Sequence, residues 1–255
     1  MPGGGVSGLT LRLGHLYPAE MNIYADRGNI AVLERRLAWR GHRLEVTELG
    51  VGDRFAPGDH DLFYLGGGQD RDQAVVAEDL VRTKGDALRA AVDGGAAGLA
   101  VCGGFQLAGH GYTGTDGSRM PGVGILDLDT IAGPTRLIGN LVIEAELDGV
   151  RRTVVGFENH AGRTRLGPGS RPLGRVLSGH GNNDEDGTEG GVTGRVIGTY
   201  LHGPLLPKNP WIADTVIAWA LTHRTGGEPV ELAPLDDTLE DMAHAAAVTR
   251  ARRRS

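Results

Sequence analysis

The stretch that decides the fold is GLAVCGGFQLAGH, residues 98–110, which contains Cys102, the only cysteine of this 255-residue chain. A run of small apolar residues predicts a buried strand before the cysteine, and residues 105–111 predict a helix after it. A nucleophile on so sharp a turn needs neighbours with little side-chain bulk, and Ala100, Gly103 and Gly104 meet that need. We interpret Cys102 as a nucleophile whose thiol pKa is lowered by the helix N-terminus. The alternative is a buried structural cysteine.

The first half of the chain alternates strand and helix patterns around this turn. Strands are expected at residues 9–17, 42–49, 60–68 and 96–101, and helices at 30–41 and 72–94, the second one broken near Gly85. In the first helix, Ile30, Leu33, Leu37 and Ala38 form one apolar stripe. This alternation predicts an α/β fold with a mostly parallel central sheet flanked by helices.

From about residue 120 the pattern changes to closely spaced β signals, at residues 125–133, 136–147, 151–160, 171–179 and 191–203, which we expect to be antiparallel strands added to the same sheet. Residues 210–224 predict a helix with Ile212, Val216 and Trp219 on one stripe, and 236–254 predict a terminal one. We find neither an internal repeat nor a linker. We therefore expect one domain over residues 1–255, with a core at about 9–225 and a C-terminal helix and basic tail at 229–255.

Composition restricts the class of protein. The net charge of −6 argues against general nucleic-acid affinity. One cysteine excludes a disulfide framework and fits a reducing compartment. We see no signal peptide and no apolar run long enough to span a membrane, so we expect a cytoplasmic protein, which a complex would place at the inner face of the membrane. The histidine spacing predicts no metal site. The acidic run DEDGTEGG (184–191) lacks the ligand spacing of a calcium-binding loop, so we expect it to form an exposed hairpin.

A cysteine nucleophile requires a base and an oxyanion hole. His202 is the candidate base, because VIGTYLHGPLLP (196–207) places it at the end of an apolar strand, at the sheet edge where the cysteine turn also lies. The candidate oxyanion loop is Gly66–Gly68, in FYLGGGQD (63–70). A plain strand-to-helix turn is the alternative there, and the loop has neither of the usual phosphate-binding glycine patterns.

The motifs VCGGFQLAG and YLHG resemble those of the class I, triad-type glutamine amidotransferases, and more narrowly the branch similar to cobyric acid synthase. Residues 9–225 carry further blocks with this resemblance: HLYPAEMNIYADRGN, YLGGGQDRDQ, RLIGN, GFENHAGRT, GNNDEDGTEGG and GTYLHGPLLPKNP. The resemblance implies a flavodoxin-like amidotransferase fold and glutaminase activity. It is tightest to glutaminase subunits that serve a ligase of peptidoglycan synthesis.

The resemblance also implies residue roles. Cys102 attacks the side-chain amide of L-glutamine, backbone N–H groups at Gly67 and Gly103 hold the oxyanion, and His202 transfers the proton. Arg136 is expected to bind the α-carboxylate of glutamine, a task that suits a guanidinium. The remaining pocket candidates are Gln106, Asn159 and His160, although such residues near turns often only bond locally.

One position departs from the family pattern. Most triad amidotransferases have a Glu two residues after the catalytic His, and this chain has Pro204 there. The orienting acid must come from elsewhere in the chain or from a partner subunit. We expect no cofactor in this chain. Because the chain has no Walker A motif, we expect ATP and Mg²⁺ to bind to a Mur-ligase-like partner subunit. That partner of the expected heterodimer would contact lipid II.

Three other functions stay open at this stage. The same glutaminase chemistry could serve another acceptor, such as a cobyrinate. The chain could be a non-catalytic binding subunit, which the presence of Cys102 and His202 disfavours. A cysteine hydrolase of peptides or esters would share the turn but would not need Arg136 as an amino-acid anchor.

Overall fold

A mostly parallel six-stranded sheet, sheet A, carries the cysteine turn. The computed structural model describes residues 8–22, 27–68 and 70–253, so residues 1–7 and the end of the basic tail, 254–255, lie outside it. The strand order in sheet A is β11-β12-β4-β3-β1-β2, and only β11 runs antiparallel to its neighbour. Its strands are β1 (Thr10–Leu16), β2 (Arg43–Leu49), β3 (Leu62–Leu65), β4 (Ala97–Val101), β11 (Gly191–Thr193) and β12 (Val196–Thr199).

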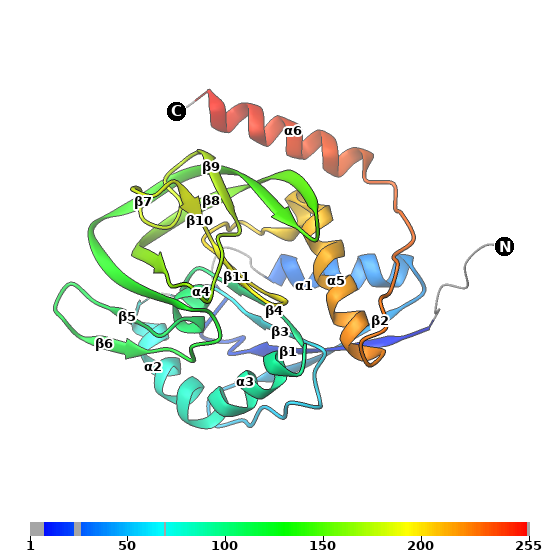
Figure 1. Ribbon diagram of the computed structural model, residues 1–255, viewed down its shortest axis with the longest axis horizontal. Coiled ribbons are helices and arrows are strands. Elements are labelled where there is room, and N and C mark those ends of the chain that lie inside the picture. The colour runs from blue at the N-terminus through cyan, green and yellow to red at the C-terminus, as the bar shows by residue number, and fades with distance from the viewer. Residues whose placement is uncertain (1–7, 23–26, 69, 254–255) are drawn as a thin grey trace.

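Helices cover both faces of sheet A. Figure 1 shows α2 and α3 below the sheet and α1 and α5 above it. The helices are α1 (Arg27–Trp39), α2 (Asp70–Asp79), α3 (Gly85–Asp93), α4 (Gly103–Ala108), α5 (Pro210–Arg224) and α6 (Thr238–Arg252). A π-helical turn, Leu80–Lys84, separates α2 from α3, so the expected interruption near Gly85 is confirmed.

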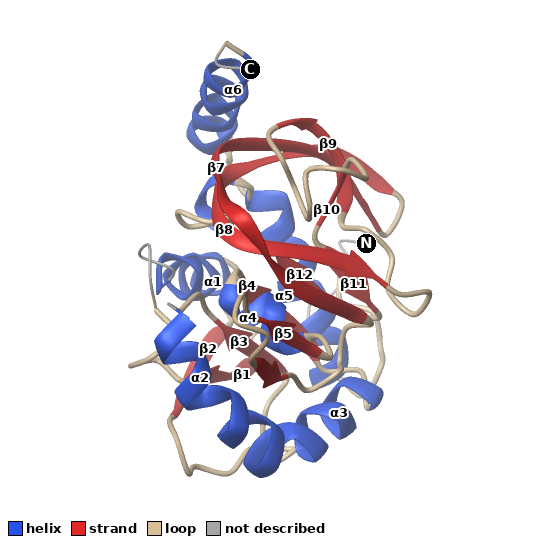
Figure 2. Ribbon diagram, turned by 90° about the vertical axis from the view of Figure 1, so that its left-hand side faces the viewer, coloured by secondary structure: helices blue, strands red, loops and turns tan. Residues whose placement is uncertain are grey.

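The later β signals build a second sheet, sheet B, so the expectation that they extend sheet A was wrong for most of them. Sheet B has the order β10-β9-β7-β5-β6, and β8 pairs with β7. Figure 2 shows it above the strands of sheet A. Its strands are β5 (Gly111–Thr113), β6 (Arg119–Pro121), β7 (Leu128–Leu147), β8 (Val150–Leu166), β9 (Gly174–Ser178) and β10 (Thr188–Glu189).

The period-2 pattern identified the strands of this region but not their sheet. Two expected strands, 125–133 and 136–147, merge into the single strand β7, whose register with β8 shifts between Ala132 and Leu137. The last strand, β12, runs parallel to β4 and was expected to be antiparallel. A continuous β7 was hard to foresee because Gly133 and Pro134 inside it are typical turn residues.

Close packing between β3 and β4 explains why β4 has a glycine at position 98. A Cβ placed on Gly98 would lie 2.2 Å from Cζ of Phe63, so the aromatic ring occupies the space that any side chain would need. One apolar core joins both sheets, since Leu141, Ile143 and Ala145 of β7 belong to the same buried cluster as β4. The cysteine turn thus rests on a tightly packed base.

The stripe expected on α1 is only partly buried. Leu33 and Leu37 are buried and Ala38 is exposed, whereas Arg36 is buried. The Arg36 guanidinium forms two-oxygen ion pairs with Asp214 and with Asp237, at 2.6–2.9 Å. Periodicity could not show this, because the partners lie more than 170 residues further along the chain.

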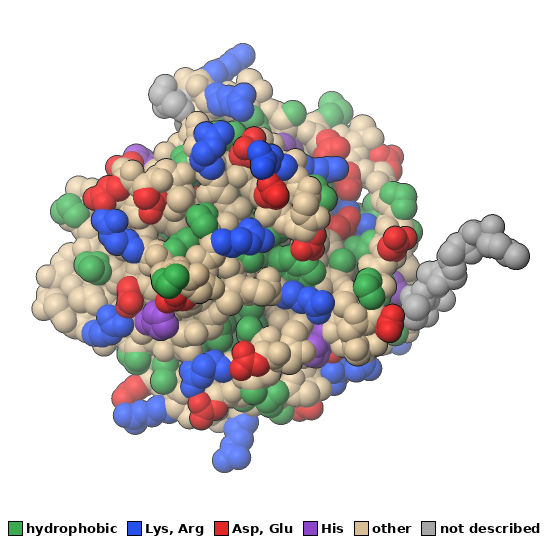
Figure 3. Space-filling view, in the orientation of Figure 1, with side chains coloured by type: hydrophobic (Ala, Val, Ile, Leu, Met, Phe, Trp, Pro, Cys, Tyr) green, Lys and Arg blue, Asp and Glu red, His purple; other side chains and the backbone are tan. Residues whose placement is uncertain are grey.

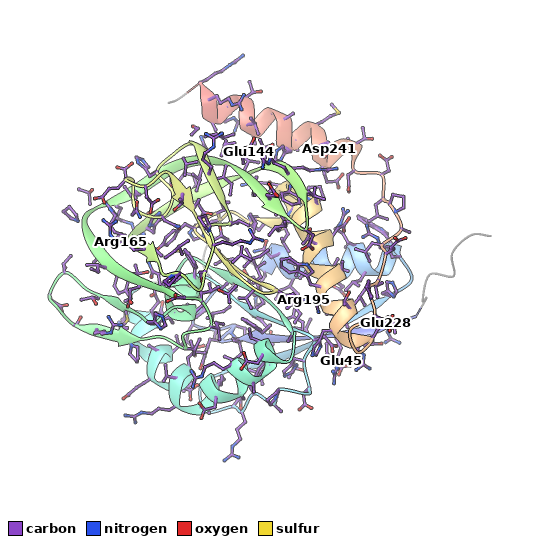
Figure 4. All side chains as sticks on the ribbon, in the orientation of Figure 1. Glu45, Glu144, Arg165, Arg195, Glu228 and Asp241 are labelled. Atoms are coloured by element: carbon purple, nitrogen blue, oxygen red, sulfur yellow. The ribbon has the colours of Figure 1, made fainter. Side chains whose placement is uncertain are left out.

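Helix α6 lies against sheet B and the segment after the candidate base. Figure 4 places Glu144 of β7 and Asp241 of α6 at the same end of the molecule. His244 is hydrogen-bonded to the Thr153 hydroxyl at 2.8 Å and to the Lys208 carbonyl at 2.9 Å. The helix is therefore part of the packed structure. No helix in the described part of the chain is long and apolar enough to cross a membrane.

Candidate active site

Cys102 occupies the strained turn that the sequence predicts, directly between β4 and α4. Its φ of 52° and ψ of −107° lie outside the regions that L-residues ordinarily adopt, a conformation that costs roughly 1–3 kcal/mol. The surrounding backbone holds it there. The Cys102 N–H donates to the Thr199 carbonyl of β12 at 2.8 Å, and the Cys102 carbonyl accepts from the Gln106 N–H at 3.1 Å.

The glycine loop after β3 packs directly against this turn. The Gly104 N–H donates to the Gly66 carbonyl at 3.1 Å. A Cβ on Gly103 would lie 3.1 Å from the Gly68 nitrogen, and one on Gly66 would lie 2.3 Å from the Met21 carbonyl oxygen. Neither the glycine loop nor the cysteine turn has room for a side chain at these positions. The backbone of both segments can therefore lie close to the same part of a substrate. Gly67 and Gly103, the predicted oxyanion residues, lie in these segments.

His202 lies at the same edge of sheet A as Cys102. Strands β4 and β12 are parallel neighbours with Val101 opposite Thr199, so Cys102 and His202 follow the ends of adjacent strands. His202 is also held by sheet B, since it exchanges two backbone hydrogen bonds with Phe157 of β8, at 2.8 and 3.3 Å. Two sheets therefore fix the position of the candidate base.

The environment of His202 keeps its imidazole neutral. Burial lowers the pKa of His202 to about 3, and electrostatic interactions with His160, Arg136 and Lys208 act in the same direction. A neutral imidazole can accept a proton from a thiol, as a general base must.

Arg136 lies at the shift in register of β7, beside β8. Its Nε donates to Oδ1 of Asn159, and Nη2 donates to the Asn159 carbonyl, both at 2.7 Å. The guanidinium is exposed at this edge and is close enough to His202 to lower its pKa. Arg136 and Asn159, two predicted substrate residues, are therefore brought together next to the candidate base.

Gln106 and His160, the other two predicted pocket residues, are buried behind the turn. Gln106 Nε2 donates to the Tyr200 hydroxyl at 3.1 Å, and this hydroxyl also bonds to Thr164 at 2.7 Å. The His160 ring stacks on the Tyr200 ring, with centroids 3.5 Å apart and planes 5° apart. Both side chains contact residues of the interior in this structure, and their predicted contact with substrate stays a prediction.

Two buried carboxylates near the site escaped the sequence analysis. Glu189 was expected on an exposed hairpin because of the acidic run DEDGTEGG (184–191), yet it is fully buried. It accepts from the Tyr200 N–H at 2.6 Å and from the Thr199 hydroxyl at 3.0 Å. Glu158 is buried as well. The only available signal was position, because Glu158 lies inside the motif GFENHAGRT and Glu189 lies inside GNNDEDGTEGG.

These groups can perform acyl transfer. A thiol on a strained turn, a neutral imidazole at the next strand end and a guanidinium beside it surround one sheet edge, next to the two glycine segments whose backbone N–H groups are the candidates for stabilising an oxyanion. Among the residues that the structure describes, no cluster of three or more His, Cys, Asp or Glu could hold a metal ion. The face in Figure 3 carries charges of both signs, without one extended basic area.

Comparison with known proteins agrees with this chemistry. Residues 12–210 match the CobB/CobQ-like glutamine amidotransferase domain. The chain is 40% identical over 243 residues to the lipid II isoglutaminyl synthase (glutamine-hydrolyzing) subunit GatD of Staphylococcus aureus, covering 95% of this chain and 97% of that protein. GatD of Streptococcus pneumoniae is 36% identical, with 90% and 87% covered. Cobyric acid synthase of Rhodobacter capsulatus is 34% identical over 112 residues, 41% of this chain and 22% of that enzyme.

Solved structures give the same fold at low sequence identity. PurLQS from Thermotoga maritima has a chain that aligns with a TM-score of 0.53 at 15% identity, covering 85% of this chain and 97% of that one. A glutamine amidotransferase crystal structure aligns with a TM-score of 0.56 at 15% identity, covering 81% and 98%. The expected amidotransferase fold is thereby confirmed.

Proposed function

The chain belongs to the CobB/CobQ-like glutamine amidotransferase family, and on that premise we propose that it is the glutaminase subunit of a lipid II isoglutaminyl synthase. It hydrolyses L-glutamine to glutamate and ammonia through a thioester on Cys102. The observation that carries the proposal is the strained Cys102 turn at the strand end next to His202, in a chain that aligns over nearly its whole length with GatD subunits.

The first half-reaction is attack on the side-chain amide of glutamine. His202 takes the thiol proton, the Cys102 sulfur bonds to the amide carbon, and the negative oxygen of the intermediate accepts from the Gly67 and Gly103 N–H groups. When the intermediate collapses, the carbon–nitrogen bond breaks. His202 returns the proton to the leaving nitrogen, which departs as ammonia.

The second half-reaction reverses these roles. Water attacks the thioester carbon while His202 takes its proton, and the same N–H groups hold the oxyanion. The carbon–sulfur bond then breaks, glutamate leaves and Cys102 is regenerated. Closely packed glycines at Gly66, Gly103 and Gly104 support this scheme, because any Cβ there would displace the loop.

Arg136 anchors the substrate by its α-carboxylate. Its guanidinium is already oriented by the two hydrogen bonds to Asn159, which lowers the entropy lost when a carboxylate binds. Asn159 thus contributes to substrate binding through Arg136. A guanidinium that binds the α-carboxylate selects an amino acid over a simple amide.

Ammonia is useful only where a carboxylate has been activated. We propose that a MurT-like subunit of the Mur ligase family binds ATP and Mg²⁺, activates the α-carboxylate of D-glutamate in the lipid II stem peptide, and receives the ammonia to form D-isoglutamine. The lengths of the alignments favour this acceptor over a cobyrinate, because the GatD subunits match over at least 87% of their length and the R. capsulatus cobyric acid synthase over 22%.

The partner also supplies the acid that orients His202. Pro204 occupies the usual position of that acid and packs against α1, where a Cβ on Gly28 would lie 2.7 Å from the proline ring. The charges that lower the pKa of His202 are cationic. A carboxylate arriving with the partner would raise the pKa of His202 and hold its ring.

The test is glutamate release from L-glutamine by the chain alone, by its complex with a Mur-ligase-like subunit, and by the complex carrying Cys102→Ala. We expect substantial turnover only in the complex, and none with Cys102→Ala. Equal turnover without the partner would refute the partner's role in the triad. No turnover in any form would refute the glutaminase function.

A further inference from the structure

We propose that Glu158 and His160 are positioning residues for the catalytic base, forming a clamp on β8 that holds the segment Tyr200–His202 in line with Cys102. The inference rests on the proposed glutaminase function, which assigns His202 its role. It differs from the prediction that His160 contacts glutamine.

The clamp begins with the main chain. Gly156 and Phe157 of β8 lie against the end of β12, where Phe157 and His202 exchange their two backbone hydrogen bonds. A Cβ on Gly156 would lie 2.9 Å from Leu201 Cδ2 and 3.2 Å from the His202 carbonyl oxygen. The strand of one sheet therefore touches the catalytic segment that extends from the other.

His160 adds a side-chain contact to the same segment. Its ring lies face to face with Tyr200, two residues before the base, and its Nδ1 is hydrogen-bonded to the Gly162 carbonyl at 2.9 Å. This bond fixes the ring plane. Because the ring is buried and parallel to Tyr200, it limits movement of the tyrosine toward β8.

Glu158 lies beside the other side of the His160 ring. Its Oε2 is 3.7 Å from His160 Nε2, a charge contact that is too long for a hydrogen bond. The two oxygens of Glu158 accept from the backbone N–H groups of His180 and Gly181 at 2.7 and 2.9 Å. A fully buried carboxylate is costly unless it is paired and hydrogen-bonded. These two bonds therefore hold the carboxylate, and with it the loop after β9, against the imidazole that supports Tyr200.

Hydrogen bonds to other residues also hold Tyr200 in place. Its N–H donates to Glu189, and its hydroxyl bonds to Thr164 and Gln106. The preceding residue, Thr199, accepts the Cys102 N–H through its carbonyl. The clamp therefore acts on one end of a short segment whose other end supports the nucleophile, so its loss changes the geometry between thiol and imidazole.

Strand alternation provides a matched control on the next residue. Asn159 faces Arg136, whereas its neighbours Glu158 and His160 face the interior. Asn159→Ala should therefore act mainly by raising the KM for glutamine. His160→Ala should act mainly by lowering kcat and by shifting the pH profile of Cys102 alkylation.

The experiment measures two properties of each full-length variant. The first is the pH profile of Cys102 alkylation by iodoacetamide in the isolated chain. No other thiol contributes to this signal, because Cys102 is the only cysteine of the chain. The sulfur displaces iodide and His202 takes the thiol proton. The second is kcat and KM for glutamine in the complex with the Mur-ligase-like subunit.

We expect His160→Ala and Glu158→Gln to lower kcat by about 10- to 100-fold, the scale of a misplacement near 1 Å, with KM changed less than about threefold. Their alkylation profiles should shift toward that of His202→Ala. His160→Phe preserves a flat ring on Tyr200 and should recover most of the loss. It also keeps the test informative if His160→Ala does not fold.

A raised KM with unchanged alkylation in the His160 variants would overturn the clamp and restore a substrate contact. Wild-type kcat and a wild-type alkylation profile in Glu158→Gln would overturn the clamp for Glu158, and the same result in His160→Ala would overturn it for His160. A wild-type complex that hydrolyses no glutamine would refute the proposed function instead, while the alkylation profiles would still report on the clamp.

Discussion

Replacing Glu189 by glutamine should change how the stability of the protein depends on pH. Burial raises the pKa of Glu189 from 4.5 to about 8, and the nearby Glu158 raises it further, while the bonds from Tyr200 N–H and the Thr199 hydroxyl lower it. The folded protein therefore keeps a proton on Glu189 at neutral pH, and the unfolded chain releases it. Glu189→Gln retains the shape and an accepting oxygen but cannot titrate.

The sign follows from proton linkage. A carboxyl whose pKa is raised in the folded state destabilises folding progressively as pH rises from the unfolded to the folded pKa, here from about 4.5 to about 8. Each pH unit within that window costs about 1.4 kcal/mol. Between pH 5.5 and 8.5 the wild type should lose about 3 kcal/mol of unfolding free energy relative to Glu189→Gln.

Urea unfolding of both proteins at pH 5.5, 7 and 8.5 measures this difference, because all other titrating groups cancel in the comparison. Parallel stability curves for the two proteins would refute the argument, since they would mean that Glu189 titrates alike in the folded and unfolded chain. A wild type that gains stability relative to Glu189→Gln as pH rises would reverse the sign and refute the argument too.

Three further predictions concern binding and stability. Arg136→Lys should raise the KM for glutamine about 10-fold or more with little change in kcat, because an ammonium cannot form the two-pronged carboxylate contact; steady-state kinetics of the complex measures it. Gly98→Ala should cost about 1–3 kcal/mol of unfolding free energy, since the new methyl would enter the Phe63 ring; urea unfolding with wild-type stability would contradict this packing. Asp214→Ala should cost about 3 kcal/mol by removing one carboxylate from the buried Arg36, and a thermal midpoint equal to that of the wild type would argue against a structural ion pair.

Local patterns were sufficient to predict the elements around the nucleophile. The small residues of β4, the glycines after Cys102 and the strand that ends before His202 each carry their signal within about ten residues of sequence. Cys102 and His202 lie at the same edge because β12 runs parallel to β4. The position of His202 at that edge was predicted, but the direction of its strand was not.

Properties that depend on distant residues were not predictable in this way. The burial of Arg36 was not predicted, because its partners, Asp214 and Asp237, lie far along the chain. Glu189 was expected in an exposed acidic hairpin. Its carboxylate is instead buried and accepts hydrogen bonds from the Thr199 hydroxyl and the Tyr200 N–H. The division of β strands between two sheets likewise depends on packing that the period-2 pattern does not encode.

The central claim is that Cys102 carries the glutamyl group during turnover. The most direct test is acid quenching of the complex while it turns over L-glutamine, followed by mass spectrometry of the peptide that contains Cys102. We predict a glutamyl thioester on this cysteine in the wild type and its absence, together with loss of ammonia release, in Cys102→Ala. Turnover that persists in Cys102→Ala would contradict the account.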